Sequence, residues 1–372
     1  MKNIKSKKSK IITGYQPYDN KRNDYLLVSK QAIEKAGYDI TQVNFSSILK
    51  CIFHTKGALK IVNFNWFDEI SANSRPQKHY KTFKRKCVIA LLKISGVKII
   101  TTIHNRVPHN TNGYANSQFR LWLIKKSNAV VQLSQDTALV LQQQTGTYWP
   151  QLKKKLYTIP HPNYSACIHE YSHSLRKTMG WDTSQFIILS TGLIRPYKNI
   201  EIIIEAAKHL KEKRNILFYI VGEANDANYA KKLVQQSKSL SNIIFDFRFV
   251  KNEELYALIE AADICLYPYN VQSSLNSGNC LLCCTLGKTC IIPEIGTVHE
   301  INSRDIFSYS YKNESEHVNA IIEKIENAYN EWANSPSEFI EHGKRLRLLV
   351  EEKYSIEKTA QRYAHLYSQL LR

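Results

Sequence analysis

The sequence predicts an α/β protein with two doubly wound domains that face a cleft. Short apolar runs alternate with amphipathic stretches along the chain, which is typical of βα units in a parallel sheet. The alternation restarts after Pro160-His161-Pro162-Asn163-Tyr164, a stiff segment suited to a domain boundary. The 372 residues are enough to give each half a core of its own. We therefore expect domains over residues 1–163 and 164–352, followed by a helical segment over 353–372.

In the first half, short apolar runs predict strands and longer segments with helical periodicity predict helices. Gly37 and Gly96 follow two of these periodic segments, as expected of residues that end helices. The predicted strands cover residues 10–13, 58–64, 97–103, 129–133 and 156–159, and the predicted helices cover residues 24–36, 77–94, 119–126 and 135–145.

The second half repeats this pattern and ends in helices. The predicted strands cover residues 186–191, 216–221, 243–249, 264–267 and 289–293, and the predicted helices cover residues 199–211, 229–237, 253–262, 280–286, 316–334, 336–352 and 355–371. Parallel strands end at a common edge of their sheet, and ligands of doubly wound domains bind beyond that edge. The loops that follow the strands are therefore the places to look for a site.

The positive charge of the chain is confined to its first half. Residues 1–165 contain 27 Lys and Arg against 7 Asp and Glu, whereas residues 166–372 contain 24 against 25. This asymmetry implies an anionic partner for the first half, either anionic lipid or nucleic acid. No RRM, KH or helix-turn-helix pattern occurs, so we expect a membrane surface rather than nucleic acid.

The apolar segments are much shorter than the ~20 residues of a membrane span. The basic N-terminus lacks the apolar region of a secretory signal, so we expect a cytoplasmic protein that associates peripherally with the inner face of the membrane. Four of the eight cysteines crowd one segment without a second metal-binding motif, and we interpret them as small buried hydrophobes: Cys280, Cys283, Cys284 and Cys290. We predict no metal site.

The loop after the predicted strand 186–191 carries two cations. Gly192 ends the strand, Arg195 and Lys198 follow, and a helix begins near Asn199. Two cations beside helix N-termini form a diphosphate site without requiring a metal. Such cations stabilise the negative charge that develops on a departing diphosphate. The alternative is a solvated basic loop.

A second phosphate-binding segment is predicted where small residues precede the helix 280–286. Ser277, Gly278 and Asn279 present backbone N–H groups there, and Gly278 allows close approach. Residues of these types also simply cap helices, which is the alternative interpretation.

His104 follows the predicted strand 97–103 in the basic half, within Thr101-Thr102-Ile103-His104-Asn105. It is a candidate to accept a proton from an acceptor hydroxyl or to hydrogen-bond a transferred sugar. The alternative is a loop histidine satisfied by the backbone. Seven carboxylates are the rival bases in this half, with Asp19 and Asp68 the strongest: Asp19, Asp24, Glu34, Asp39, Asp68, Glu69 and Asp136.

The predicted helix 77–94 combines lysines with an apolar stripe, which suits contact with anionic lipid. The segment Phe119-Arg120-Leu121-Trp122 is a possible aromatic anchor for the same surface. The alternative is an ordinary helix whose stripe packs on its own sheet. Several motifs are absent: Asp-x-Asp, the P-loop, GxGxxG after a strand, and GxSxG. Their absence argues against metal-chelating sugar transferases and against ATP or dinucleotide chemistry.

Several short motifs of the second half occur in a fixed order: Gly192…Arg195…Lys198, Val221-Gly222, Ala261-Ala262-Asp263, Ser277-Gly278…Leu286-Gly287-Lys288 and Ile291-Ile292-Pro293-Glu294-Ile295-Gly296. Taken together, they resemble the family 4-like glycosyltransferases of the GT-B fold, which has two Rossmann-like domains. In the basic half, His104-Asn105…Pro108-His109 and Ile159-Pro160-His161 are similar to a subgroup of bacterial capsule and exopolysaccharide synthesis.

The resemblance implies a hexosyltransferase-like enzyme that takes a sugar from a nucleoside diphosphate sugar, as substrate and without a cofactor, to a lipid-linked or oligosaccharide acceptor. It implies that Arg195 and Lys198 grip the donor diphosphate, and that His104 lies near the reacting sugar. It also implies that the last helix crosses back to the first domain. Further donor contacts are implied for Gly192, Gly222, Phe249, Val250, Ser277, Gly278 and Asn279.

One departure affects the donor. The family often carries two glutamates eight residues apart, and here those positions hold Ser274 and Leu282. Ribose recognition, donor identity and the retaining or inverting outcome therefore stay open. Two other function classes also stay open: a GT-B-fold epimerase that remodels the nucleotide sugar, and a non-catalytic protein that binds nucleic acid or membrane.

Overall fold

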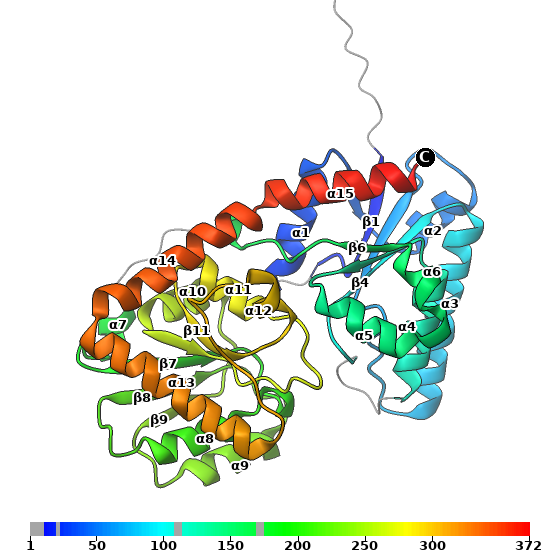
Figure 1. Cartoon of the computed structure of the whole chain (residues 1–372). Coiled ribbons are helices and arrows are strands. Elements are labelled where there is room, and N and C mark those ends of the chain that lie inside the picture. The colour runs from blue at the N-terminus through cyan, green and yellow to red at the C-terminus, as the bar shows by residue number, and fades with distance from the viewer. Residues whose placement is uncertain (1–10, 20–22, 108–113, 169–174) are drawn as a thin grey trace, which may run out of the picture. The chain divides into compact units, whose positions relative to one another are not determined.

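The computed structural model describes residues 11–19, 23–107, 114–168 and 175–372. The chain divides into two compact units, the first formed by residues 1–162 and 354–372 and the second by residues 163–353. Each unit is built on a six-stranded parallel sheet with helices on its faces (Figure 1). The predicted α/β fold with two doubly wound domains is confirmed.

The sheet of the first unit has the strand order β2-β1-β3-β4-β5-β6. Its strands are β1 (Ile12–Gln16), β2 (Asp39–Gln42), β3 (Ile61–Asn65), β4 (Lys98–Ile103), β5 (Ala129–Gln132) and β6 (Leu156–Thr158). Its helices are α1 (Asp24–Lys35), α2 (Phe45–Ile52), α3 (Arg75–Ile94), α4 (Tyr114–Lys126), α5 (Asp136–Thr145), α6 (Trp149–Lys153) and the C-terminal α15 (Ile356–Leu370).

The C-terminal helix α15 packs on α1 and completes the core of the first unit (Figure 1). Tyr363, Leu366 and Tyr367 are buried in one cluster with Tyr15 and Tyr25. These large side chains lie on one face of α15, so the last residues of the chain are structurally part of the first unit.

The second unit has the strand order β12-β11-β10-β7-β8-β9, which reverses direction between β7 and β10. Its strands are β7 (Phe186–Thr191), β8 (Ile216–Val221), β9 (Ile243–Asp246), β10 (Ile264–Leu266), β11 (Cys290–Pro293) and β12 (Phe307–Tyr309). Its helices are α7 (Leu175–Thr178), α8 (Ile200–His209), α9 (Ala227–Ser237), α10 (Asn252–Ala261), α11 (Gly278–Thr285), α12 (Gly296–Ile301), α13 (Glu314–Asn334) and α14 (Pro336–Lys353). Ligands of doubly wound sheets bind where the order reverses.

Some elements differ from the predictions. The strands β2 and β12 and the helices α2 and α12 are present but were not predicted, because they are short and carry weak patterns: β2 is only four residues long and partly exposed. The predicted strand 243–249 ends at Asp246, so Phe249 and Val250 lie in the loop before α10.

Candidate active site

Lys198 is folded back against the end of β7. Its Nζ atom donates a hydrogen bond to the carbonyl oxygen of Thr191, at 2.9 Å, and the side chain is only 6% exposed. Gly192 follows with a φ of +96°, a left-handed conformation that favours glycine. A Cβ atom at this position would lie 2.7 Å from the Lys198 Nζ atom. Glycine therefore leaves room for the lysine at the carboxyl end of the strand.

The start of α11 meets the same point. The Asn279 Nδ2 atom donates to the carbonyl oxygen of Thr191 at 3.2 Å, so it shares this acceptor with Lys198. Ser277 caps the helix by accepting a hydrogen bond from the Cys280 backbone N–H, at 3.1 Å. Gly278 is the first helical residue. The structure thus brings Gly192, Lys198 and the predicted phosphate-binding segment together.

The loops after β7 and β10 are bonded to each other at the point where the strand order reverses. The Asn199 Nδ2 atom donates to the Pro268 carbonyl at 2.9 Å, and the Asn270 N–H donates to the Tyr197 carbonyl at 2.9 Å. The Lys198 Nζ atom lies 5.6 Å from the centre of the Tyr269 ring. The sequence did not predict a role for this loop after β10, because Pro268-Tyr269-Asn270 carries no charged group.

Gly222 supports the site from the neighbouring strand β8. A Cβ atom on it would lie 2.1 Å from the Gly192 carbonyl oxygen. The Gly192 N–H donates to the Val221 carbonyl at 3.1 Å, and the Ile194 N–H donates to the Glu223 carbonyl at 3.0 Å. Gly222 therefore allows close approach of two backbones, which positions the loop that carries Arg195 and Lys198.

The electrostatics favour an anion at this point. Burial, and to a smaller extent the nearby positive charge of Arg195, lower the pKa of Lys198 to about 8. Arg195 is half-buried, and its side chain has no hydrogen bond or ion pair with any residue that the structure describes. Two neighbouring cations without a carboxylate partner raise each other's energy, and a bound diphosphate would relieve that cost.

Two predicted donor contacts lie in a different loop, the one that follows β9. Phe249 is 42% exposed there and Val250 is half-buried. Ser274 and Leu282, which replace the family glutamates, are both 6% exposed. Glu294 accepts a hydrogen bond from the Ser310 hydroxyl.

The crowded cysteines lie on α11 and on the strands β10 and β11, with buried side chains, as expected of small hydrophobic residues. Cys265, Cys280, Cys283, Cys284 and Cys290 are all fully buried. Among the described residues, no three His, Cys, Asp or Glu side chains are grouped so as to hold a metal ion.

In the first unit, His104 follows β4 and is 8% exposed. Its ring stacks on Trp66 with centroids 3.8 Å apart, and its Nε2 atom lies 3.0 Å from Asn65 Oδ1. Burial, followed by the nearby charges of His161 and Arg120, lowers the pKa of His104 well below its usual value. His104 is therefore neutral at pH 7 and is a weak base.

The residues around His104 were not predicted as site residues. Tyr25 contacts both histidines, with ring centroids 5.0 Å from His104 and 4.6 Å from His161. Asn65 follows the pattern of polar residues at strand ends, and that signal was available in the sequence.

The rival base Asp68 is buried and paired with Arg120 at 2.5 Å, so its carboxylate is held in a structural ion pair. Asp19 is exposed. Pro108 and His109, part of the capsule-type motif, lie outside the described residues.

The predicted aromatic anchor at residues 119–122 is wrong. Phe119 and Arg120 are buried, at 2% and 4% exposure, and Trp122 packs against the core formed by α2, α3 and β3. The segment faces inward because the Arg120 side chain pairs with Asp68 and donates hydrogen bonds to the carbonyl oxygens of Asn105 and Arg106.

Comparison with known proteins relates most of the second unit to a family of transferases. Residues 172–346 match the family model of glycosyl transferases group 1. A GDP-mannose:glycolipid 4-beta-D-mannosyltransferase of Xanthomonas campestris pv. campestris is 20% identical over 259 residues. That match covers 68% of this chain and 66% of the relative, just under two thirds of the relative's length.

Solved structures share the fold over nearly the whole chain. Sucrose-phosphate synthase of Thermosynechococcus elongatus superposes with a TM-score of 0.72 at 13% identity, covering 97% of this chain and 99% of that one. Anabaena HepE, solved in complex with UDP and glucose, gives a TM-score of 0.69 at 15% identity, covering 97% and 100%. The chain thus has the GT-B fold of these structures, and residues 172–346 match a glycosyl transferase family.

Proposed function

We propose that this chain transfers a sugar from a nucleoside diphosphate sugar to a lipid-linked glycan acceptor in surface polysaccharide synthesis, without a metal ion. One observation carries the donor half of this proposal. Lys198 Nζ and Asn279 Nδ2 converge on the Thr191 carbonyl beside Gly192, where the order of the second sheet reverses. The complex of HepE with UDP and glucose supports a nucleotide sugar as donor.

The chemistry follows from the charges. In the transfer, the bond between the sugar and the diphosphate breaks, the acceptor oxygen forms the new bond to the sugar, and its proton passes to the departing diphosphate or to solvent. Lys198, Arg195 and the N–H groups at the start of α11 stabilise the negative charge of the leaving diphosphate. We assign His104 to hydrogen bonding with the transferred sugar rather than to proton removal, because its pKa is lowered and Asn65 holds its Nε2 atom.

The acceptor half rests on α2 and α3. Each helix buries one face, with Ile48 and Cys51 on α2 and Ile89 and Leu92 on α3 in a shared core. The solvent side of α3 nevertheless carries an apolar stripe, which we call the α3 stripe: Tyr80, Phe83, Leu91 and Ile94, exposed by 65%, 66%, 39% and 85%. On α2 and directly after it, Phe45 and Phe53 are 77% and 71% exposed.

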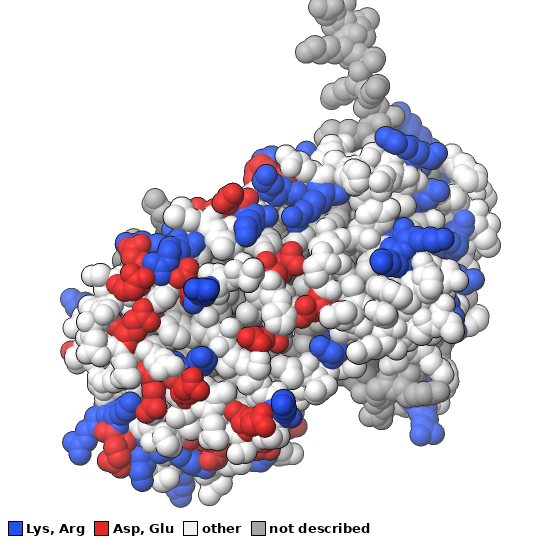
Figure 2. All heavy atoms as spheres, in the orientation of Figure 1, with Lys and Arg blue, Asp and Glu red and all other residues white. Residues whose placement is uncertain are grey.

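Cations accompany these exposed aromatics. Lys84 and Lys86 are exposed on α3, and the first half of the sequence has a large excess of positive charge. On the face shown in Figure 2, acidic and basic residues alternate over the second unit, whereas basic residues predominate over the first. An apolar stripe flanked by lysines fits the headgroup region of an anionic bilayer. No described helix meets the length and hydropathy needed to span a bilayer.

We therefore place the enzyme peripherally at the inner face of the cell membrane. The glycolipid acceptor of the Xanthomonas relative supports a membrane-borne substrate. A surface position would bring the first unit close to a lipid-linked chain and so raise the local concentration of acceptor.

A thermal-shift panel tests the donor assignment. UDP, GDP, CMP, dTDP and ADP, each with its sugar conjugates, are compared on the full chain and on Lys198→Ala. Binding to the native state raises the melting temperature, so the size of the shift ranks the nucleotides by affinity. We expect one nucleoside diphosphate to give a clear shift that Lys198→Ala abolishes. A shift of equal size in the variant, or no shift with any nucleotide, would contradict the donor site.

A further inference from the structure

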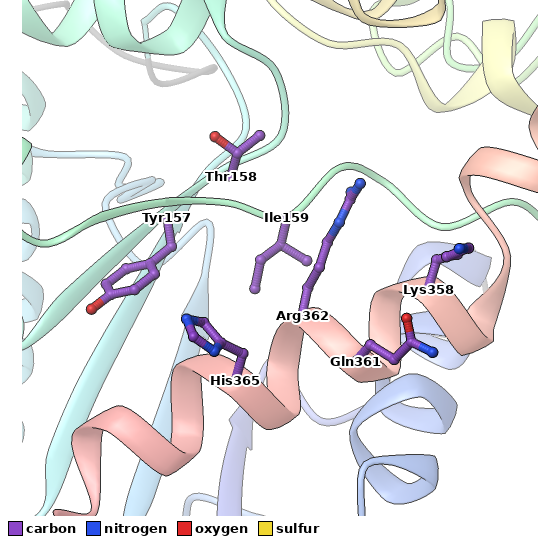
Figure 3. Close-up of a pocket in the computed structure, with 7 residues that line it drawn as sticks. All are labelled: Tyr157, Thr158, Ile159, Lys358, Gln361, Arg362 and His365. Carbon is purple, nitrogen blue, oxygen red and sulfur yellow. The ribbon is translucent and has the colours of Figure 1, made fainter.

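A small pocket opens in the first unit between the end of β6 and the helix α15 (Figure 3). Tyr157, Thr158 and Ile159 line one side, and residues of α15 line the other. Its volume of about 270 Å³ lies slightly below the range of small-molecule sites, ~300–1,000 Å³. The pocket therefore suits one monosaccharide or one charged group rather than a whole nucleotide sugar.

The α15 side of the pocket is basic. Lys358, Arg362 and His365 occupy positions i, i+4 and i+7 of the helix, which places them on one face. Figure 3 shows Arg362 and His365 projecting from α15 toward the segment Tyr157–Ile159. None of the described residues that line the pocket is acidic.

The two permanently charged residues of this face, Lys358 and Arg362, are not neutralised within the described structure. The side chains of Lys358 and Arg362 have no hydrogen bond or ion pair with a described residue, whereas the adjacent Glu357 is paired with Lys35 on α1. Like charges at i and i+4 of a helix repel each other and destabilise it. An oxyanion in the pocket would convert this repulsion into two charge-assisted hydrogen bonds.

The opposite side offers both a hydrogen-bonding group and an apolar surface. Thr158 Oγ1 accepts hydrogen bonds from Gln132 Nε2 at 2.8 Å and from Gln135 Nε2 at 3.3 Å. Its own hydroxyl hydrogen is then available to a ligand. Ile159 is 2% exposed and the Tyr157 ring is half-buried, so they form an apolar wall next to the cations.

The register of the strands places the pocket at the same sheet edge as His104. Ile103, at the end of β4, pairs with Gln132 of β5, and Gln132 pairs with Thr158 of β6. Two strand spacings of ~4.8 Å separate β4 from β6. The pocket therefore begins roughly 10 Å from the strand that carries His104, on the edge where parallel strands present ligands.

From this geometry we propose that the pocket binds an oxyanion of the acceptor, a carboxylate or a phosphate, at the edge of the first sheet that also carries His104. This inference rests on the proposed function, because it assumes that the acceptor lies along the carboxyl edge of the first sheet. An acidic sugar of the glycan and the diphosphate of a lipid carrier share the chemistry that the pocket recognises. Arg362 supplies a planar fork that fits either group.

The test compares two probes, glucuronate and inorganic pyrophosphate, by isothermal titration of the full chain. Arg362→Gln removes one exposed pocket cation, and Lys60→Gln removes one exposed cation just before β3, at the opposite sheet edge. We expect one probe to bind, with an affinity that falls at least tenfold in Arg362→Gln and less than twofold in Lys60→Gln. Glucuronate binding would indicate an acidic sugar, and pyrophosphate binding the lipid carrier.

The donor assay separates this inference from the proposed function. Arg362→Gln should keep the wild-type thermal shift with the donor nucleotide and the wild-type melting temperature. Absence of binding for both probes, or equal losses in Arg362→Gln and Lys60→Gln, would overturn the pocket assignment and leave the donor site intact. A failed donor panel with a positive probe titration would overturn the transferase site instead.

Discussion

A Cβ atom on Gly222 would lie 2.1 Å from the carbonyl oxygen of Gly192. The two glycines end neighbouring strands, β8 and β7, and both have positive φ angles, +158° and +96°. Their close contact brings the backbone of the Arg195–Lys198 loop toward the start of α11. The proposed donor site is thus shaped by two missing side chains as much as by the charged groups that are present.

Substitution of these glycines should distinguish the effect of backbone strain on stability from the effect of a side chain on donor binding. We expect Gly222→Ala to destabilise the second unit by about 3 kcal/mol or more, because backbone must move to accept the methyl group. Gly192→Ala should cost about 1–2 kcal/mol of stability and weaken donor binding, because its Cβ meets Lys198 Nζ and Asn279 Nδ2. Urea unfolding and donor titration measure the two effects.

Gly180→Ala is the matched control. Gly180 has a φ of +67°, and a Cβ atom on it would meet no described residue within 4 Å, so its substitution reports the backbone conformation alone. Donor binding should be unchanged in this variant. Equal stability losses in Gly180→Ala and Gly222→Ala would show that the contact with Gly192 is unimportant.

Lys198→Ala should lower the rate of sugar transfer by roughly 10²-fold or more, because a cation that faces the leaving diphosphate is lost. Lys211→Ala removes an exposed lysine of the same unit and should leave the rate unchanged. The measurement is the initial rate of transfer with the sugar conjugate of the nucleotide found in the donor panel. Unchanged turnover in Lys198→Ala would remove the lysine from the mechanism.

The strand–loop–helix positions were predictable because they depend on local patterns. The run from Phe186 to Leu189 is uniformly apolar and the strand ends at a glycine, which locates the carboxyl end of β7 and hence the loop of Lys198. The sequence also predicts His104 at the end of β4, where the structure has it.

Other features depend on tertiary contacts and could not be predicted. The inward orientation of Arg120 follows from its ion pair with Asp68, 52 residues away in sequence. The stacking of His104 on Trp66 needs β3 and β4 to be neighbours in register. The α15 pocket joins residues about 200 positions apart, and the sequence of neither segment indicates that it meets the other.

Reversal of charge on α3 should release the protein from anionic vesicles. Lys84→Glu with Lys86→Glu changes four units of charge beside the α3 stripe, and each lysine near a bilayer contributes about 1 kcal/mol. Vesicle co-sedimentation should show at least a tenfold loss of binding. Lys231→Glu with Lys238→Glu makes the same change in the second unit and should bind as the wild type. Equal losses in the two variants would point to net charge alone.

Removal of divalent metal should not affect transfer. The proposed site would present two cations to the diphosphate, Lys198 and Arg195, where a metal-dependent transferase would present carboxylates to a metal ion. Initial rates after dialysis against EDTA should match those of untreated enzyme. Loss of activity that Mg²⁺ or Mn²⁺ restores would show that the metal-free proposal is wrong.

Acid should destabilise the second unit through His317. Its ring is 2% exposed and lies 3.0 Å from the Tyr309 hydroxyl, and burial lowers its pKa to about 4. The His317 ring takes up a proton near pH 6.5 in the unfolded chain, but only near pH 4 in the folded chain. The contribution of neutral His317 to the free energy of unfolding is therefore complete above pH 6.5 and is lost as the pH falls toward 4, by up to roughly 3 kcal/mol.

Urea unfolding at pH 7, 5 and 4 should show a smaller loss of stability at low pH in His317→Gln, which keeps a polar partner for Tyr309. His54→Gln, at an exposed position after α2, should follow the wild type, and an unchanged pH dependence in His317→Gln would assign the acid sensitivity to other groups.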